Sequence, residues 1–236
     1  MSFRQIVLDT ETTGLEPSLG HRVIEIACVE VVNRRVTDRN YHQYLNADRD
    51  SDPGALQVHG LTSEFLRDKP RFREIAREFL EFIAGSELII HNAPFDIGFL
   101  NAELTRIDLL SLTTHVAGVT DSLRLAKDLH PGKRNNLDSL CERYGIDNSS
   151  RTLHGALLDA RLLAEVYLAM TRGQDSLVMD LGREESGAVV EAAHVDPATL
   201  DLVVVQAGAD ELEAHAAVLE DLHKASRGAC VWKAAG

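Results

Sequence analysis

The chain has 236 residues, three scattered cysteines and a net charge of −13. No apolar stretch approaches the roughly 20 residues that a membrane helix needs, and the N-terminus runs directly into a predicted strand, which leaves no room for a signal peptide. The odd cysteine count, without metal-ligand spacing, argues against a disulfide framework. We therefore expect a cytoplasmic, disulfide-free protein with one well-buried domain and an extension.

Acidic residues are concentrated towards the C-terminus. Residues 174–236 carry 12 acidic and 4 basic side chains, a net charge of −8, whereas residues 1–173 carry 25 acidic and 20 basic ones, a net charge of −5. A strongly acidic surface disfavours binding to a long nucleic-acid duplex. The better balanced first segment remains compatible with a short contact to one strand end.

Apolar patterns in residues 1–173 predict alternating strands and helices. Strands are predicted at 4–9, 23–32, 36–45, 88–91 and 116–121, and helices at 71–83, from about 95, at 122–129, at 137–144 and at 155–170. Residues 33–35 are typical of a hairpin turn, and Asn136 is typical of a helix cap. Hairpins followed by strand–helix alternation predict an α/β domain with a mixed five-stranded sheet and helices on both faces.

The character of the sequence changes after residue 173. Residues 180–198 have little periodicity and read as a linker, which together with a short peptide before it makes up the segment 174–198. A helical pattern follows at 210–224, and an isolated helix of that length is marginal in water. We therefore predict three parts: a domain at 1–173, a linker at 174–198, and a docking segment at 199–236.

Asp9 and Glu11 are the most informative pair in the chain. They follow the apolar run 6–8 and precede a Thr-Thr-Gly breaker, so they lie at the end of a buried strand. Side chains two apart on a strand point to the same face, and adjacent carboxylates there repel each other and resist desolvation. Such a pair is explained by a divalent cation, and carboxylate oxygens suit Mg²⁺ or Mn²⁺. The pattern predicts a two-metal site for phosphoryl transfer.

Three more residues extend this hypothesis. Asp96 follows Pro94, a residue suited to the first turn of a helix, so by itself it could simply stabilise that helix N-terminus. Asp159 lies in the first turns of the 155–170 helix, and His154 precedes it with a ring free to reach the same cleft. A lone histidine is commonly a surface or core residue, but its pKa near 6.5 also suits a general base. The spacing of all five residues favours one site.

In that order and spacing, Asp9-x-Glu11, Asn92-Ala93-x-Phe95-Asp96 and His154-x4-Asp159 resemble the DEDDh family of 3′→5′ exonucleases. The similarity is dense over residues 4–173 and is greatest to the proofreading branch that serves bacterial replicative DNA polymerases. The resemblance implies a ribonuclease H-like fold, a bacterial cytoplasmic location, and metal-dependent removal of nucleoside 5′-monophosphates from DNA 3′ ends.

Roles for individual residues follow from the resemblance. Asp9, Glu11 and Asp159 would hold two Mg²⁺ or Mn²⁺ ions, with Asp96 contributing directly or through a water, and His154 would be the general base. Nucleotide contacts are implied for Glu11, Thr10, Thr12, Leu15 and His59. The sequence departs from the family at Gly54, where an acidic residue is common, so no ligand is assigned there.

The tail carries two further signals. Gln174, Leu177 and Met179 resemble the short peptide by which bacterial proteins dock on the sliding clamp (beta), although short motifs of this kind also occur by chance. The 199–236 segment resembles the part of such exonucleases that binds the polymerase catalytic (alpha) subunit; the residues assigned to that contact are Leu212, Leu219, Leu222 and Trp232. Trp is enriched at interface hot spots. A small theta-type subunit is a further candidate partner.

Two other functions compete with DNA proofreading. An exoribonuclease of the same superfamily would use the same acids to trim RNA 3′ ends, but it would not need the clamp peptide or the polymerase anchor. A scaffold that only stabilises a polymerase would not need all five site residues, and all five are present. The sequence therefore favours the DNA exonuclease.

Overall fold

The structure is a computed structural model that describes residues 4–149, 151, 153–172, 207–226, 230 and 232. The chain divides into two compact units, Met1–Met179 and Asp180–Gly236. The predicted linker and the clamp-peptide residues Gln174, Leu177 and Met179 lie outside the described residues. Among those described, no helix is both long and apolar enough to cross a bilayer.

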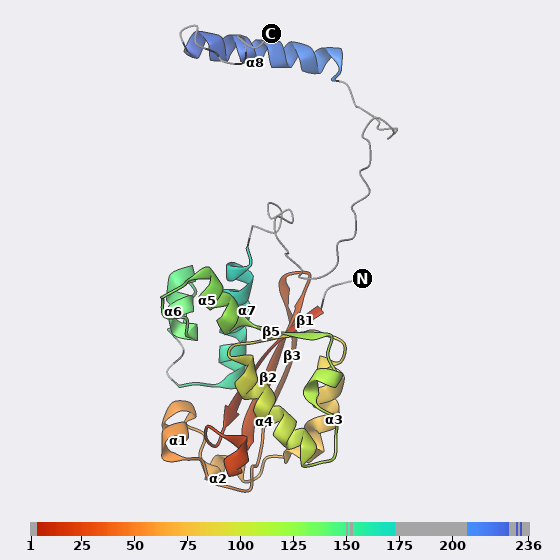
Figure 1. Ribbon diagram of the computed structural model, residues 1–236, viewed down its shortest axis with the longest axis vertical. Helices are drawn as coiled ribbons and strands as arrows, with labels where there is room; N and C mark the ends of the chain where they lie inside the picture. The colour runs from red at the N-terminus through yellow and green to blue at the C-terminus, as the bar shows by residue number, and fades with distance from the viewer. Residues whose placement is uncertain are drawn as a thin grey trace, which may run out of the picture. The chain divides into compact units, whose positions relative to one another are not determined.

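The first unit contains a five-stranded mixed sheet (Figure 1). Its strands are β1 (Arg4–Thr12), β2 (Val23–Val32), β3 (Arg35–Tyr44), β4 (Glu87–Ile90) and β5 (Gly118–Asp121). They lie in the order β3-β2-β1-β4-β5; β1, β2 and β3 pair antiparallel, and β1, β4 and β5 pair parallel. Asn33 and Arg34 have φ values of 49° and 62°, as a tight hairpin turn between β2 and β3 requires.

Helices cover both faces of this sheet, as the sequence predicted. They are α1 (Pro53–His59), α2 (Ser63–Leu66), α3 (Phe72–Ile83), α4 (Ala93–Thr105), α5 (Ser122–Leu129), α6 (Leu137–Tyr144) and α7 (Ala156–Met170), with short 3-10 turns at Pro17–Leu19 and Leu112–Thr114. The predicted cap of α6 is present, because Asn136 Oδ1 accepts the Ser139 N–H at 3.0 Å.

Alternation along β1 decides which side chains face which layer. Ile6 and Leu8 are fully buried in the core formed with α3 and α4, whereas Val7 is fully buried in the core formed with α5, α6 and α7. By the same alternation, Asp9 and Glu11 continue the Val7 face towards α7, and Thr10 continues the opposite face towards α4. The end of β1 therefore presents polar groups to both helical layers.

The structure differs from the sequence prediction around the end of β1. The strand does not end at Asp9, as predicted, but continues to Thr12, the first residue of the breaker, which pairs with Val23 across an irregularity in the ladder. Helices α1 and α2 were not predicted at all. Only His59 is buried in α1, so that segment lacks the apolar periodicity by which a helix is recognised.

The second unit contains α8 (Ala209–Ala225), close to the predicted 210–224. No side chain of α8 is buried, and Leu212 and Leu222 are 57% and 46% exposed. Helices normally cover their apolar stripe with a partner. Trp232 is also 75% exposed, so several apolar side chains of this unit are exposed among its described residues.

Candidate active site

Four carboxylates converge where β1 ends between the first turns of α4 and α7. Asp96, Asp159 and Glu11 are buried, and Asp9 is half-buried. Asp96 lies in the first turn of α4 and its Oδ1 accepts a 2.7 Å hydrogen bond from the Thr10 hydroxyl. Because Thr10 lies between Asp9 and Glu11 on β1, this bond ties the α4 acid to the strand that carries the other two.

Burial, with a smaller contribution from neighbouring negative charges, raises the pKa values of three of these acids. Burial, followed by the charge of Glu25 and of Asp159, raises the pKa of Glu11 to about 8. Burial, which outweighs the bond from Thr10, raises the pKa of Asp96 to about 7. The pKa of Asp9 is raised well above its usual range by burial and then by the charge of Asp96. The site therefore holds more negative charge than the protein neutralises.

A fifth carboxylate, which the sequence analysis missed, lies beside this group. Glu25 on β2 is directly opposite Glu11 in the β1–β2 ladder and is buried. Its Oε1 lies 2.7 Å from His42 Nε2, so a neighbouring ring compensates it. Only the strand register, which single-sequence patterns do not fix, reveals this proximity.

The donor set fits divalent cations. Oxygens of Glu11 and Asp159 and a ring nitrogen of His154 all lie within 4.8 Å of one another. Hard carboxylate oxygens suit Mg²⁺ or Mn²⁺, and added positive charge would stabilise the ionised form of these buried acids. We find no other group of three potential ligands at this spacing within the described part of the chain.

Arg151 is the most important residue that the sequence analysis missed. Its guanidinium donates to both oxygens of Asp159, from Nε to Oδ1 and from Nη2 to Oδ2, each at 2.7 Å. Nη1 also donates to Asp138 Oδ1 at 2.7 Å. The Arg151 side chain is only 6% exposed, so Asp159 alone of the four acids has a buried cation as its partner.

The same arginine restrains His154, whose ring we expected to be free. Arg151 Nη2 lies 2.9 Å from His154 Nδ1, and because a guanidinium can only donate, Nδ1 must accept. The His154 backbone N–H also donates to the Val58 carbonyl of α1 at 3.0 Å. In this arrangement a neutral His154 carries its proton on Nε2.

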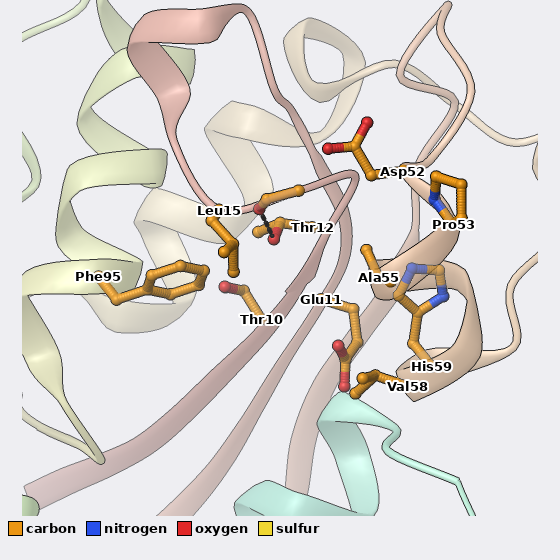
Figure 2. Close-up of a pocket in the computed structure, with 12 residues that line it drawn as sticks. Thr10, Glu11, Thr12, Leu15, Asp52, Pro53, Ala55, Val58, His59 and Phe95 are labelled. Carbon is orange, nitrogen blue, oxygen red and sulfur yellow. Dashed lines mark hydrogen bonds between the residues drawn. The ribbon is translucent and has the colours of Figure 1, made fainter.

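A cavity of about 500 Å³ adjoins Glu11 on the α1 side (Figure 2). It brings together all the predicted nucleotide contacts, and its lining residues include Thr10, Glu11, Thr12, Leu15, His59, Phe95 and Gly54. Figure 2 shows Phe95 and His59 on opposite sides of the end of β1. The lining is largely apolar, which suits a flat base and sugar between polar anchors.

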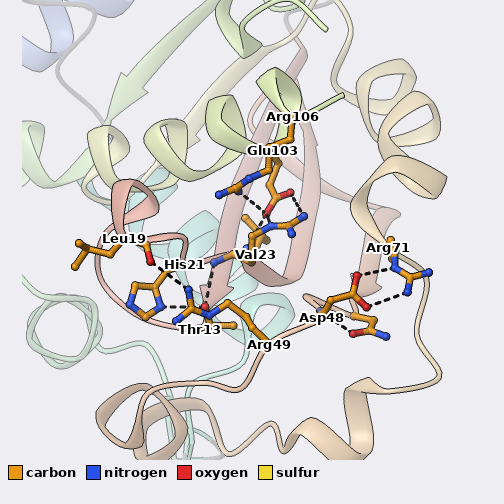
Figure 3. A network of polar contacts seen from close by, with 11 residues as sticks. Thr13, Leu19, His21, Val23, Asp48, Arg49, Arg71, Glu103 and Arg106 are labelled. Carbon is orange, nitrogen blue, oxygen red and sulfur yellow. Dashed lines mark hydrogen bonds and ion pairs between the residues drawn. The ribbon is translucent and has the colours of Figure 1, made fainter. Parts of the chain in front are cut away.

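The turn after β1, which contains Gly14 and forms part of the cavity wall, is packed closely against the ring of His21. A Cβ added to Gly14 would lie 2.3 Å from the His21 ring, so no larger residue fits there without displacing that ring. Thr13 Oγ1 lies 3.1 Å from His21 Nδ1 and accepts the Arg22 N–H at 3.0 Å (Figure 3). Arg22 in turn makes two bonds to the buried Glu103 of α4, at 2.5 and 2.6 Å.

A second cavity, of about 290 Å³, lies on the other side of the acids. It is lined by Asp9, His91, Asn136, Leu137, Asp138, Arg151, His154, Asp159 and Leu163. The two cavities therefore flank the carboxylates, with the α1 wall on one side and the N-terminus of α6 on the other. A linear substrate could place one unit in the first cavity and leave through the second.

Comparison with known proteins identifies the family of this chain. The sequence profile of the family described as Exonuclease matches residues 6–167. The chain is 52% identical to the DNA polymerase III subunit epsilon of Escherichia coli (strain K12), covering 98% of each chain, and 50% identical to that of Pasteurella multocida (strain Pm70), covering 98% of this chain and 93% of the relative.

Solved structures share the fold at lower identity. Exonuclease X in complex with 5′ overhanging duplex DNA is 24% identical, with a TM-score of 0.55 over 70% of this chain and 90% of its own. A 3′-exonuclease that recognises a histone mRNA stem-loop is 16% identical, with a TM-score of 0.60 over 71% of this chain and 63% of its own.

The carboxylate repulsion predicts an unusual pH dependence of stability. Because the folded-state pKa of Glu11 is raised to about 8 from an ordinary 4.5, metal-free protein should lose stability as the pH rises between those values. The Glu11→Gln variant lacks this ionisable group and should not lose stability in this way. In chelator, the difference between the Tm of the variant and that of the wild type should therefore grow as the pH rises to about 8. Glu78→Gln, the same change on the exposed face of α3, serves as the control. A Tm difference independent of pH would contradict the account.

Arg151 should act on stability through Asp159. Arg151→Ala leaves a buried carboxylate unpaired, which costs about 3–5 kcal/mol of unfolding free energy. Adding Asp159→Asn removes that charge, so the double variant should recover much of the loss in urea unfolding with chelator present. Arg143→Ala, which removes an arginine bonded to Asn135 and the Arg134 carbonyl, should show no such recovery with Asp159→Asn. Additive losses in both pairs would show that Arg151 does not act through Asp159.

Proposed function

The chain belongs to the exonuclease family and to the DNA polymerase III epsilon subunits within it, and it is a 3′→5′ exonuclease. From this premise we propose that it proofreads the 3′ end of the primer. The proposal adds the substrate, a frayed or single-stranded DNA 3′ end in the complex with the polymerase, and the product, nucleoside 5′-monophosphates. The convergence of four carboxylates beside a nucleotide-sized cavity is the observation that carries it.

Asp9, Glu11 and Asp159 would hold two divalent cations, Mg²⁺ or Mn²⁺, with Asp96 contributing directly or through a water. Bound cations would supply the positive charge that activates the attacking water and stabilises the leaving 3′ oxygen. The Thr10 hydroxyl keeps Asp96 beside β1, and Arg151 orients Asp159 by donating hydrogen bonds to both of its carboxylate oxygens. The protein contributes fixed geometry, which an in-line displacement requires.

The terminal nucleotide would occupy the larger cavity. Leu15 and Phe95 offer apolar contact to the base and sugar, and the Thr10, Thr12 and His59 side chains are the polar candidates. Residues of α1 form one wall of the cavity, and a nucleotide bound there would place the scissile phosphate beside Glu11. This arrangement supports removal of one nucleotide at a time.

His154 would accept the proton of the attacking water as general base. Its Nδ1 is the nitrogen that faces Asp159, at 3.4 Å from Oδ2, and Arg151 now donates to it. That bond must open for His154 to act as a base, because Nδ1 accepts a proton only when Arg151 no longer donates to it, and acceptance at Nε2 requires the ring proton to move to Nδ1, which breaks the same bond. The backbone bond from His154 to Val58 leaves the ring free to make either change.

The proposed domain organisation assigns catalysis to residues 1–173 and assembly to the rest. Residues 174–198 would carry the clamp contact through Gln174, Leu177 and Met179. Residues 199–236 would bind the polymerase catalytic (alpha) subunit. The exposed Leu212, Leu222 and Trp232 and the half-buried Leu219 support that assignment, because an apolar stripe on α8 needs a partner. A theta-type subunit would be a further partner, and the bacterial cytoplasm the place of action.

Digestion of a 5′-labelled DNA primer with a mismatched 3′ nucleotide tests the function. With Mg²⁺ or Mn²⁺ we expect a ladder that shortens from the 3′ end. The ladder should disappear in chelator and in the Asp9→Ala, Glu11→Ala double variant, because both remove the cations. An undiminished ladder in the folded double variant would contradict the assignment of these carboxylates.

Matched DNA and RNA oligonucleotides separate the proposed function from its main alternative. An exoribonuclease with the same acids would digest the RNA faster, whereas we expect the DNA to be digested faster under identical conditions. Initial rates at several concentrations give kcat/KM for each. A strong preference for RNA would favour the alternative and overturn the proofreading proposal.

Truncation tests the role of the tail. Removal of residues 199–236 should abolish binding to the polymerase catalytic subunit while leaving exonuclease activity on free oligonucleotides within about two-fold, because the site residues all lie in the first unit. Size-exclusion chromatography with the purified partner measures the first effect and primer digestion the second. Loss of activity on truncation would show that the tail belongs to the catalytic fold.

A further inference from the structure

An exposed pair of basic side chains lies beside the second cavity. Lys133 and Arg134 belong to the α5–α6 connection, which we call the basic loop (residues 130–135), and both are exposed. Neither forms an ion pair within the described part of the chain, as is also true of other exposed cations such as Arg73 and Lys127. What distinguishes Lys133 and Arg134 is that they are adjacent in sequence and lie close along the chain to Asn136, which lines the second cavity.

The basic loop is held rigidly by its own hydrogen bonds. Asn135 is buried, and its Nδ2 donates to the carbonyls of His130 at 3.3 Å and Lys133 at 3.1 Å. Arg143 of α6 donates to Asn135 Oδ1 at 3.0 Å and to the Arg134 carbonyl at 2.7 Å. A preformed loop loses little conformational entropy when it binds a ligand, so these bonds suit a binding role.

The surface around the basic loop is an open hollow with net positive charge. It is lined by Lys133, Arg134, Arg143, Ser139 and Glu142, which together carry three positive charges and one negative charge. Ser139 adds a hydroxyl, and the hollow lies along the first turn of α6, where the helix dipole also favours an anion. Lysine, arginine and hydroxyl groups are the usual contacts to nucleic-acid phosphates.

The residues that line the hollow lie close along the chain to residues that line the second cavity. Asn136, Leu137 and Asp138 line the second cavity together with Asp9 and Asp159. Successive Cα atoms are about 3.8 Å apart, so the Arg134 backbone lies within about 8 Å of Asn136. A strand whose last nucleotide fills the larger cavity and which leaves past Asn136 would next meet the basic loop.

We propose that the basic loop binds the phosphates of the DNA strand just upstream of the nucleotide being removed, through Lys133 and Arg134. The inference rests on the proposed exonuclease function and names where its substrate strand runs. These cations would offset the repulsion that a phosphodiester meets as it approaches a site built from carboxylates. They would affect strand binding rather than the chemical step.

The test compares two substrates in the full-length Lys133→Gln, Arg134→Gln double variant. A 5′-labelled oligothymidylate reaches the loop, whereas the p-nitrophenyl ester of thymidine 5′-monophosphate is too short to do so. The control is Arg73→Gln, Arg77→Gln on α3, which changes the net charge equally but lies on exposed positions of the opposite helical layer. Arg77 pairs only with the exposed Glu81, so its loss costs little stability.

We expect the loop variant to raise KM for the oligonucleotide several-fold at low salt and to leave kcat/KM for the ester within two-fold of wild type. Each single-strand phosphate contact contributes about −0.7 to the slope of log affinity against log salt concentration. When the salt concentration is raised four-fold, the KM of the variant, which lacks two contacts, should therefore rise by a factor about seven-fold smaller than the KM of the wild type. The control variant should match wild type in both respects.

Three outcomes would overturn the inference. The first is a loop variant that matches the control in KM and salt slope; the second is an equal loss on the ester, which would place the loop's effect at the chemical step. The third is unchanged oligonucleotide kinetics with loss of binding to the polymerase or the clamp, which would make the loop a protein-docking surface. If the wild-type protein cleaves neither substrate, the proposed exonuclease function fails rather than the inference about the loop. The fluorescence anisotropy of the labelled oligonucleotide in Ca²⁺ then still compares how tightly the wild type and the loop variant bind the strand.

Discussion

Repulsion among buried carboxylates is the constraint on which the rest of this structure depends. Asp9, Glu11 and Asp96 have raised pKa values because burial removes them from water, and neighbouring carboxylates raise the pKa values of Asp9 and Glu11 further. Such a cluster opposes folding, so it persists only if the surrounding structure over-determines its geometry. The stability that the cluster costs is recovered when cations bind, because a ligand that binds only the folded state stabilises it.

The surrounding contacts hold the acids from three directions. The Thr10 hydroxyl ties Asp96 and α4 to β1; the Arg22–Glu103 pair ties α4 to the start of β2; and Arg151 joins α7 to the segment before it through Asp159. The first two ties join elements that are distant in sequence, whereas the third is local. The two helical layers are thus connected at the one edge of the sheet where hydrophobic packing gives way to polar groups.

Much of this arrangement could be predicted because it depends on local patterns. The apolar alternation around Val7, the Asn136 cap and the Asp9-x-Glu11 spacing are all visible in sequence, and with them the sheet, the helices and the five site residues. Glu25 and Arg151 could not be found in this way. Glu25 reaches Glu11 only through the β1–β2 register, and Arg151 reaches Asp159 only because the chain turns before α7. Helix α1 was missed because only its last residue is buried.

The most direct test of the account is the response of metal-free, full-length protein to Mn²⁺, followed by thermal unfolding. If the carboxylates form a cation site, the wild-type Tm should rise in a saturable manner with Mn²⁺. The Asp9→Asn, Glu11→Gln double variant should begin at a higher Tm, because the repulsion is relieved, and should gain little more. Equal gains in the two proteins would show that Mn²⁺ binds elsewhere, and the central claim would then be wrong.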